Sequence, residues 1–321
     1  MSPPGWTERA IDRYTWAVAA ATLLAAAVTA LVPLGDLAAA IVMISAVLLV
    51  GVPHGAYDLE VGRRWLRERL GSAWWVAFGA GYVACATLGV LFWIAAPTAG
   101  LIVLLVGGAI HWGADDIEVI SGSRLARLWL AFSRGTIPVV LPLLWHPDET
   151  ARVFGVLVSA EVNPRVVLIS GALAAAVGLA GLAQQIGLAW SRNRAIVPRV
   201  AAEVLVLVLW FAVTEPVLAF TIYFCFWHSI RHSIRSMGKI DQASPSRALM
   251  RYVKAVWLPT LLTIVAAAVA IGLVRLDGDA QSAIWRVTFI GLFALTIPHV
   301  LLELVEGSSS APASMPEMAR D

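Results

Sequence analysis

Charged residues are scarce in this chain. Only 14% of its 321 residues are charged and 60% are hydrophobic, whereas soluble domains have about 25% charged and about 45–50% apolar residues. An ordinary soluble domain is therefore excluded. The net charge is only +2, and no basic stripe is interleaved with aromatic side chains, so we expect no nucleic-acid partner.

Cysteine and lysine are almost absent. Cys85 and Cys225, the two cysteines, lie inside apolar segments, so we interpret them as small buried residues without a disulfide framework. The lack of thiolates also argues against a soft-metal or iron–sulfur site. The only lysines are Lys239 and Lys254, and neither lies deep in a predicted span. A retinal-binding opsin, which needs an intramembrane lysine for its Schiff base, is therefore excluded.

Long apolar runs dominate the rest of the sequence. Runs such as 16–34 and 255–274 have the length of a bilayer-crossing helix. They predict an all-α protein, a polytopic transmembrane helical bundle of about 8–10 spans. The candidate spans are 16–34, 37–55, 74–96, 98–113, 128–145, 166–188, 197–213, 216–231, 255–274 and 287–305.

Two parts of this topology have alternatives. Only the tripeptide Thr-Glu-Pro separates the spans 197–213 and 216–231, which could instead form a broken or re-entrant pair. Arg134 and Pro138 interrupt the span 128–145.

The chain divides into three parts by composition. We predict a cytoplasmic N-terminal segment (1–15), a single transmembrane domain (16–305) and a disordered C-terminal tail (306–321). Arginines concentrate in alternate loops, as in RRWLRER at 63–69. By the positive-inside rule, both termini are cytoplasmic. We expect a multi-pass protein of the inner (plasma) membrane.

Histidine is rare, yet five of the six histidines fall toward the predicted cytoplasmic ends of spans. These five are His54, His111, His228, His232 and His299.

A single histidine at a span end is usually an interfacial or capping residue. His228 and His232 differ because they share one helix face at a depth where polar groups tend to mark function. His146 lies on the other side, in a loop turn, and is not a candidate. The pattern predicts a histidine metal site near the cytoplasmic side. Neutral imidazole suits zinc, copper, iron and nickel alike.

Three of the five histidines are followed by a carboxylate four residues later. The pairs are His54 with Asp58, His111 with Asp115, and His299 with Glu303. Such residues are neighbours on a helix, and a metal-binding histidine usually donates its other ring N–H to a carboxylate, carbonyl or water. We expect Asp58, Asp115 and Glu303 to serve as such partners or as extra ligands, although a partner from another helix is equally compatible with the sequence.

Four motifs together resemble the Brp/Blh family of membrane-embedded bacterial and archaeal β-carotene 15,15′-dioxygenases, which are associated with rhodopsin systems. The motifs are GVPHGAYD (51–58), HWGADD (111–116), FWHSIRHS (226–233) and IPHVLLE (297–303).

The resemblance implies a cofactor, a reaction and partners. Matched by motif, the family's iron(II) ligands fall on His54, His111, His228 and His232, with His299 as a further ligand candidate. The implied reaction splits β-carotene with O2 at the central double bond into two all-trans-retinal molecules. Membrane lipid and a functional link to a rhodopsin are the other implied partners.

Aromatic residues near the motifs are candidates to line an apolar groove for the polyene. They are Tyr57, Trp112, Tyr223, Phe224 and Trp227. Each of them also suits an interfacial belt or helix packing. The family more often has phenylalanine at the position of Trp112, which changes the pocket shape and leaves the substrate range open.

Other functions fit the sequence less well. Membrane di-iron desaturases and hydroxylases need about eight histidines, including adjacent pairs, whereas this chain has six and no adjacent pair. A cytochrome b would place histidines at both bilayer faces. A polytopic transporter with a histidine metal site could use Arg134, Glu203 and Glu215 as an ion path. A structural Arg134–Glu203 ion pair explains two of these residues more simply.

Overall fold

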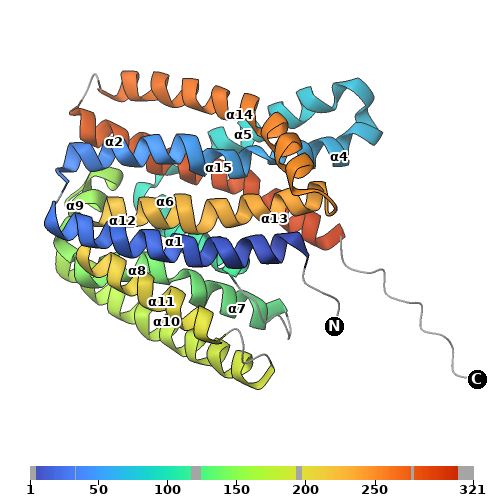
Figure 1. Ribbon diagram of the computed structural model, residues 1–321. Helices are drawn as coiled ribbons and strands as arrows, with labels where there is room; N and C mark the ends of the chain where they lie inside the picture. The colour runs from blue at the N-terminus through green and yellow to red at the C-terminus, as the bar shows by residue number, and fades with distance from the viewer. Residues whose placement is uncertain (1–4, 33, 117–123, 193–196, 276–277, 310–321) are drawn as a thin grey trace, which may run out of the picture.

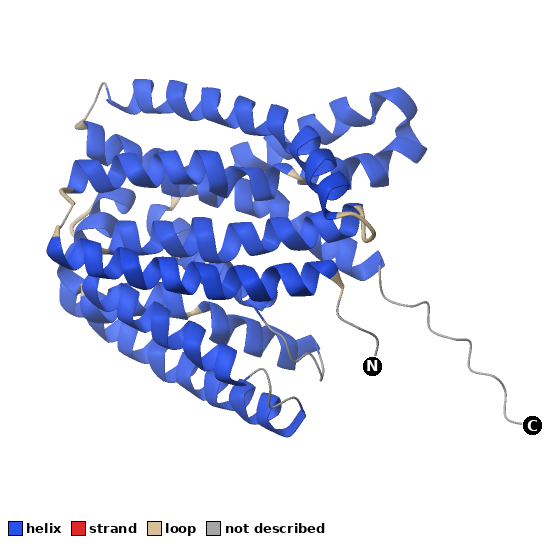
Figure 2. Cartoon of the chain, in the orientation of Figure 1, coloured by secondary structure: helices blue, strands red, loops and turns tan. Residues whose placement is uncertain are grey.

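The computed structural model describes residues 5–32, 34–116, 124–192, 197–275 and 278–309. Within these ranges nearly every residue is helical and there is no strand (Figure 2). The predicted all-α class is confirmed.

Most of the long helices lie side by side along the length of the molecule (Figure 1). Their bounds are α1 Trp6–Leu31, α2 Asp36–Ala46, α3 Val52–Ala56, α4 Asp58–Leu70, α5 Trp74–Ala95, α6 Pro97–Asp116, α7 Arg124–Gly135, α8 Ile137–Trp145, α9 Pro147–Val158, α10 Pro164–Arg192, α11 Val197–Val213, α12 Pro216–Ile222, α13 Ile230–Ile240, α14 Pro245–Val274 and α15 Ala280–Ser309. Two π-helical segments, η1 (Val47–Gly51) and η4 (Tyr223–Ser229), and the short 3₁₀ turn η2 (Gly71–Ala73) join some of them.

Seven helical stretches among the described residues are long and apolar enough to cross a bilayer. One of them, Asp36–Ala95, covers the predicted span 37–55 and all but the last residue of the predicted span 74–96. The chain turns between these spans after α4, at Gly71, whose positive φ of 54° is one that glycine adopts without strain. Because this turn divides one stretch in two, eight of the ten predicted spans lie within the seven stretches or extend at most three residues beyond their ends.

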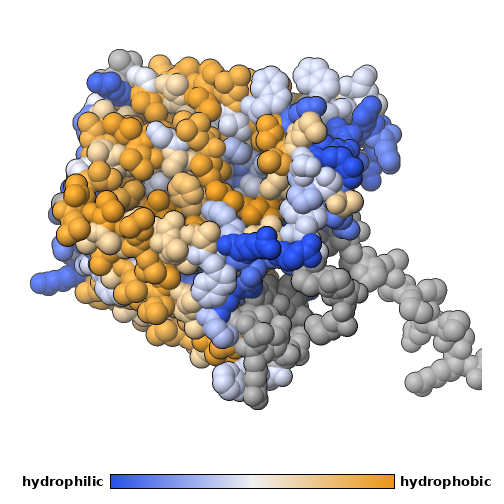
Figure 3. Space-filling model, in the orientation of Figure 1, coloured by the Kyte–Doolittle hydropathy of each residue, from blue (hydrophilic) through white to orange (hydrophobic). Residues whose placement is uncertain are grey.

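The surface agrees with a multi-pass membrane protein. Large apolar side chains such as Leu24, Leu88 and Leu173 are each at least 67% exposed, and apolar residues cover most of the visible face (Figure 3). Polar residues gather over α4 and near the start of α1 (Figure 3), at the end of the molecule where α13 and α15 also end (Figure 1). We call this end the polar end. An apolar belt of this extent suits lipid contact.

The region 197–240 forms two separate helices. After α11 the chain turns back at Thr214 and Glu215, and a continuous helix of α12, η4 and α13 follows to Ile240. The Glu215 carboxylate accepts from the backbone N–H groups of Val217 and Leu218, which would otherwise lack partners at the start of α12. The helix that contains the predicted span 216–231 therefore continues for nine residues beyond it. The segments 197–213 and 216–231 belong to two complete helices and do not form a broken or re-entrant pair.

The predicted domain ends differ slightly from the helix ends. α1 begins at Trp6, inside the predicted N-terminal segment. α15 continues to Ser309, into the predicted tail. The rest of that tail, 310–321, lies outside the described residues.

A buried ion cluster joins α7, α11 and α13. Arg134 donates from Nη2 to Glu203 Oε2 at 2.7 Å, and Arg231 donates from Nη1 to the same oxygen at 3.1 Å. The predicted Arg134–Glu203 pair is confirmed. Because Arg134 and Glu203 hold these helices together, and Glu215 caps α12, the three side chains have structural roles and no longer favour a transporter.

Glycines allow α6 and α7 to pack unusually closely. A Cβ atom on Gly113 would lie 1.7 Å from the carbonyl oxygen of Ala131, and one on Gly135 would lie 1.8 Å from that of Ala109. Only glycine permits such contact between two helix backbones. Since His111 lies two residues before Gly113, this contact also sets the position of His111.

Replacing Gly113 by alanine is therefore expected to force α6 away from α7. Overpacking typically costs about 1–3 kcal/mol, so we expect a clearly lower melting temperature in detergent and weaker metal binding through His111. Gly107→Ala, on the same helix, is the control, because a Cβ there meets nothing within 4 Å and a helical Gly→Ala change gains up to about 1 kcal/mol. Equal melting temperatures for the two variants would contradict this account.

Candidate metal centre and apolar pocket

Five histidines from five different segments meet in the interior. They are His54 of α3, His111 of α6, His228 of η4, His232 of α13 and His299 of α15. Nine of their ring-centroid distances lie between 5.0 and 6.5 Å, the shortest being His111 to His228 and His111 to His299. Each of the five is at most 8% exposed. The structure therefore brings together all five histidines that the sequence singled out.

Several ring nitrogens of this cluster have no hydrogen-bond partner in the described structure. The Nε2 atoms of His111, His228 and His299 are buried and unpartnered. Leaving a buried polar atom unpaired is costly, and a metal ion is a partner that several imidazole nitrogens can share. The candidate ligand atoms of His54, His111 and His299 all lie within 4.8 Å of one another. The donor set thus fits a transition metal such as iron, zinc or copper.

Three carboxylates surround the histidines and contact their other ring nitrogens. His299 donates from Nδ1 to Asp58 Oδ1 at 2.9 Å, and His232 donates from Nδ1 to Asp115 Oδ2 at 2.7 Å. Nδ1 of His228 is 3.7 Å from Asp115 Oδ2.

Glu303 is the third of these carboxylates. Its Oε2 lies 3.0 Å from Nδ1 of His111. A proton held on Nδ1 by a carboxylate leaves the Nε2 lone pair free for a metal. The arrangement therefore fixes the tautomer that metal binding requires.

The carboxylates pair across helices rather than four residues along one helix. Asp58 contacts His299, not His54, and Glu303 contacts His111 through Nδ1. Asp115 contacts His232, not His111. For His54 and His111 the expected pairing along one helix is thus corrected, in favour of the alternative of a partner from another helix, whereas His299 and Glu303 also lie near each other along α15, with Nε2 and Oε1 3.7 Å apart. The reason is tertiary: α15 packs against α4 and α6, and this packing brings the carboxylates to histidines distant in sequence.

His54 is held by its own helix. Its Nδ1 contacts the carbonyl oxygen of Gly51, three residues earlier. A Cβ on Gly51 would lie 2.6 Å from the ring of Phe224, so the glycine lets η1 approach η4. π-Helical turns often occur at functional sites because they shift side chains relative to a regular helix. Here two such turns, packed together, flank His54 and carry His228.

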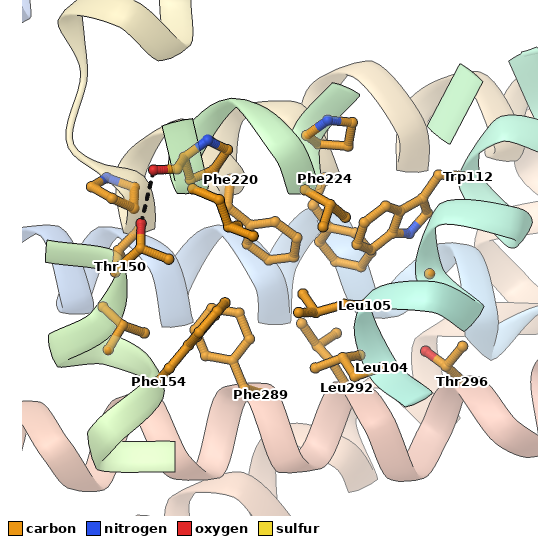
Figure 4. A pocket seen from close by; sticks show the side chains of 18 of the residues that line it. Leu104, Leu105, Trp112, Thr150, Phe154, Phe220, Phe224, Phe289, Leu292 and Thr296 are labelled. Carbon is orange, nitrogen blue, oxygen red and sulfur yellow. Dashed lines mark hydrogen bonds between the residues drawn. The ribbon is translucent and has the colours of Figure 1, made fainter. Parts of the chain in front are cut away.

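An apolar pocket begins at the histidines. The empty space along its lining residues, including the part open to the outside, is about 830 Å³. Figure 4 shows Thr150 and Phe154 at one end and Trp112 and Thr296 at the other. His54 and His111 belong to its wall. Because the Thr150 hydroxyl donates to the carbonyl of Pro142, the remote end offers a ligand little free hydrogen-bonding capacity.

The predicted pocket residues divide into two groups. Trp112 and Phe224 line the pocket, whereas Tyr57, Tyr223 and Trp227 do not. Trp227 is fully buried and donates to Thr22 Oγ1 of α1, and Tyr223 is 2% exposed in the core. Tyr57 stacks on Tyr252, with ring centroids 5.8 Å apart. These three residues therefore have packing contacts instead.

Most of the pocket wall was not predicted from sequence. The additional lining residues are Leu104, Leu105, Gly108, Pro138, Val139, Pro142, Leu143, Thr150, Val153, Phe154, Pro216, Val217, Phe220, Phe289, Leu292 and Thr296. One signal could have found Phe220: it precedes Phe224, His228 and His232 at four-residue spacing, and such residues share one helix face. The Phe220 and Phe224 rings are indeed stacked, 5.6 Å apart. The other residues carry no motif.

His146 is the sixth histidine and takes no part in the cluster. Its Nε2 lies 2.9 Å from the carbonyl oxygen of Phe211. It therefore supports a turn between α8 and α9, as the sequence indicates.

Comparison with known proteins identifies similar sequences over most of the chain. A family model described as "Beta-carotene 15,15'-dioxygenase" matches residues 45–305. The chain is 30% identical over 225 residues to "Probable beta-carotene 15,15'-dioxygenase Blh" of Halobacterium salinarum, a match that covers 64% of each protein. It is 28% identical over 265 residues to "Beta-carotene 15,15'-dioxygenase" of uncultured marine bacterium 66A03, covering 80% of this chain and 90% of the relative.

A third relative has a more limited match. "Probable beta-carotene 15,15'-dioxygenase Brp" of Halobacterium salinarum is 28% identical over 210 residues, 60% of this chain and 57% of the relative. The chain thus matches 64% and 57% of the length of the two Halobacterium salinarum relatives. No solved structure matches the chain.

Proposed function

Because the chain belongs to the β-carotene 15,15′-dioxygenase family, we propose that it splits β-carotene at the central 15,15′ double bond with iron(II) and O2. The products are two molecules of all-trans-retinal, and each aldehyde receives one of the two oxygen atoms. The observation that carries the proposal is that His54 and His111 of the five-histidine cluster also form part of the wall of the apolar pocket.

The histidines are the proposed iron ligands. His54, His111, His228, His232 and His299 would hold the ion through ring nitrogens, and a bound iron would supply the binding and activation of O2. Asp58, Asp115 and Glu303 accept the remaining ring protons and keep the imidazoles oriented.

The pocket positions the polyene. Its wall contributes leucine, valine, proline and phenylalanine side chains, which bind a hydrocarbon through the hydrophobic effect and exclude water. A chain lying along the pocket from Phe154 toward Trp112 would bring an inner double bond toward His54 and His111. Since the substrate dissolves in the bilayer, membrane lipid is its source, and the retinal product suits a rhodopsin as its consumer.

We also propose that the protein lies in the plasma membrane with both termini in the cytoplasm. The support is the distribution of arginines, which accumulate on α4 at the polar end together with the end of α13. The histidine cluster would then lie toward the cytoplasmic side.

Expression in bacteria that accumulate β-carotene tests the proposed reaction. We expect bleaching of the cells and two retinal molecules for each β-carotene lost, measured by chromatography. In purified protein the yield should depend on O2 and be abolished by an iron chelator and restored by iron(II). Bleaching without retinal, or unequal aldehydes, would show a different cleavage bond. Full activity without iron would overturn the metal assignment.

A further inference from the structure

A second, smaller pocket lies on another side of the histidine cluster. It has an empty volume of about 270 Å³. Its lining residues are Tyr57, Asp58, Val61, His232, Ser236, Lys239, His299, Leu302, Glu303 and Glu306. His232 and His299 border this polar pocket, whereas His54 and His111 border the apolar one. The cluster thus contacts two spaces of opposite chemistry.

The polar pocket leads from the buried histidines to the surface. His299 and Asp58 are 4% and 5% exposed, the side chain of Glu303 is 32% exposed, and that of Lys239 is 51% exposed. At the outer end, Lys239 donates from Nζ to Glu306 Oε2 at 2.7 Å. This ion pair between α13 and α15 lies at the mouth of the pocket, at the polar end of the bundle (Figure 1).

The charge of the polar pocket suits a cation. Asp58, Glu303 and Glu306 contribute three carboxylates, and Lys239 is the single lysine or arginine among the described residues of the wall. The Nε2 atom of His299 is buried and has no hydrogen-bond partner in the described structure. An excess of carboxylates beside an unpartnered imidazole nitrogen is a suitable environment for a divalent metal ion.

Glu303 connects the pocket to the inner histidines. Its Oε1 lies 3.7 Å from Nε2 of His232 and 3.7 Å from Nε2 of His299. These three residues form a second group whose ligand atoms lie within 4.8 Å of one another. His299 belongs both to this group and to the group with His54 and His111. One imidazole nitrogen binds one ion at a time, so an ion held through the same nitrogen of His299 would occupy only one of the two groups at once.

We propose that the polar pocket is the route by which a divalent metal ion reaches the histidine centre. Glu303 receives the ion together with His232 and His299, and His299 stays bound as the ion moves inward to His54 and His111. The Lys239–Glu306 ion pair closes the mouth. This inference rests on one part of the proposed function, namely that the histidines hold a metal ion.

The polyene and its aldehyde product fit this pocket poorly. Its volume is about one third of that of the apolar pocket, and its charged walls would have to lose water against a hydrocarbon. The two pockets therefore separate the path of the metal from the path of the substrate.

The test measures how fast metal-free protein takes up cobalt(II). The full chain, stripped with a chelator and reconstituted in nanodiscs, is mixed with Co²⁺ at low ionic strength. Uptake is followed by the cobalt absorption bands, and the final metal content is measured by mass spectrometry. Lys239→Met removes the positive charge at the mouth and is expected to raise the uptake rate constant about 3–10-fold. Glu306→Gln leaves Lys239 without its carboxylate partner and should lower the uptake rate constant by a similar factor.

Both variants break the same ion pair, yet they are expected to change the uptake rate in opposite directions. If the ion pair only stabilised the structure, both variants would change the rate in the same direction. Both should reach the final cobalt content of the wild type, and both effects should shrink at high salt. Lys254→Met is the matched control: it removes the other lysine, which is exposed on α14 outside the pocket, and should leave the rate unchanged.

Three outcomes would overturn the proposal. Equal rates in all variants, or changes of the same sign in Lys239→Met and Glu306→Gln, would show that the ion takes another route while the metal centre remains. A response of Lys254→Met equal to that of Lys239→Met would indicate a general surface-charge effect. Wild-type protein that binds no cobalt or iron would refute the metal centre itself and the route with it.

Discussion

His299→Ala is expected to lose bound iron as completely as His54→Ala or His111→Ala. The candidate ligand atoms of these three histidines lie within 4.8 Å of one another, and removing one of them leaves only two imidazoles in that group. We therefore expect metal content near zero and no detectable retinal formation, measured by mass spectrometry and chromatography on the same samples. His228→Ala and His232→Ala should behave in the same way.

His146→Ala is the matched control, because the ring of this sixth histidine contacts only the Phe211 carbonyl among the described hydrogen bonds. It should keep full iron content and activity, with at most a small loss of stability. Circular dichroism and elution volume should show that every variant is folded. Any of the five alanine variants that retained full iron would remove its histidine from the ligand set.

The second large effect is expected at the carboxylates that hold the histidine ring protons. Asp58→Asn weakens the hydrogen bond from His299, and Asp115→Asn weakens that from His232. Losses of such partners typically reduce metal affinity or activity by about 10–100-fold. Excess iron(II) should restore part of the activity of both variants, whereas it should not restore the histidine variants.

Two further variants sharpen this test. The Tyr82 hydroxyl donates to Asp58 Oδ2 at 3.0 Å, so Tyr82→Phe should lower metal affinity in the same direction by a smaller factor. Asp148→Asn, an exposed change at the start of α9, should leave affinity unchanged. Unaltered metal affinity in both Asp58→Asn and Asp115→Asn would show that these carboxylates only stabilise the fold.

Local sequence is sufficient for the class of the protein and for its candidate ligands. Apolar runs of bilayer length, with few charges, leave helices as the structure that satisfies every backbone hydrogen bond in lipid. A single histidine at a span end carries little information, but a pair on one helix face at membrane depth, together with three more at the same ends of other spans, indicates function. For this reason the amino-acid sequence alone singles out His54, His111, His228, His232 and His299.

The ends of the helices were predicted less accurately from the sequence than the candidate ligands. α1 begins at Trp6 and the α12–α13 helix continues to Ile240, because polar residues also form helix where a bundle end supports them. Hydropathy along the sequence marks the apolar part of a helix that lies in the bilayer. It does not show where the same helix continues into water.

The partners of the histidines depended on tertiary structure. Asp58 and Asp115 are four residues from His54 and His111, and a single helix would favour those pairs. α15 instead supplies His299 to Asp58 and Glu303 to His111, and α13 supplies His232 to Asp115. Packing decides between such alternatives because hydrogen bonds depend on distances of tenths of an ångström, which sequence spacing does not fix.

The two pockets also depend partly on sequence and partly on tertiary structure. The amino-acid sequence by itself determined that five imidazoles, three carboxylates and many apolar side chains would share one membrane-embedded bundle. Only the packing of α6, α8, α9, α12 and α15 decided that residues without any motif, such as Leu105, Phe154 and Phe289, enclose an apolar space beside His54 and His111. Only the meeting of α4, α13 and α15 placed Glu303, Glu306 and Lys239 around a polar space on another side. A pocket is the volume that several helices leave unfilled, so it has no counterpart in any one segment of the chain.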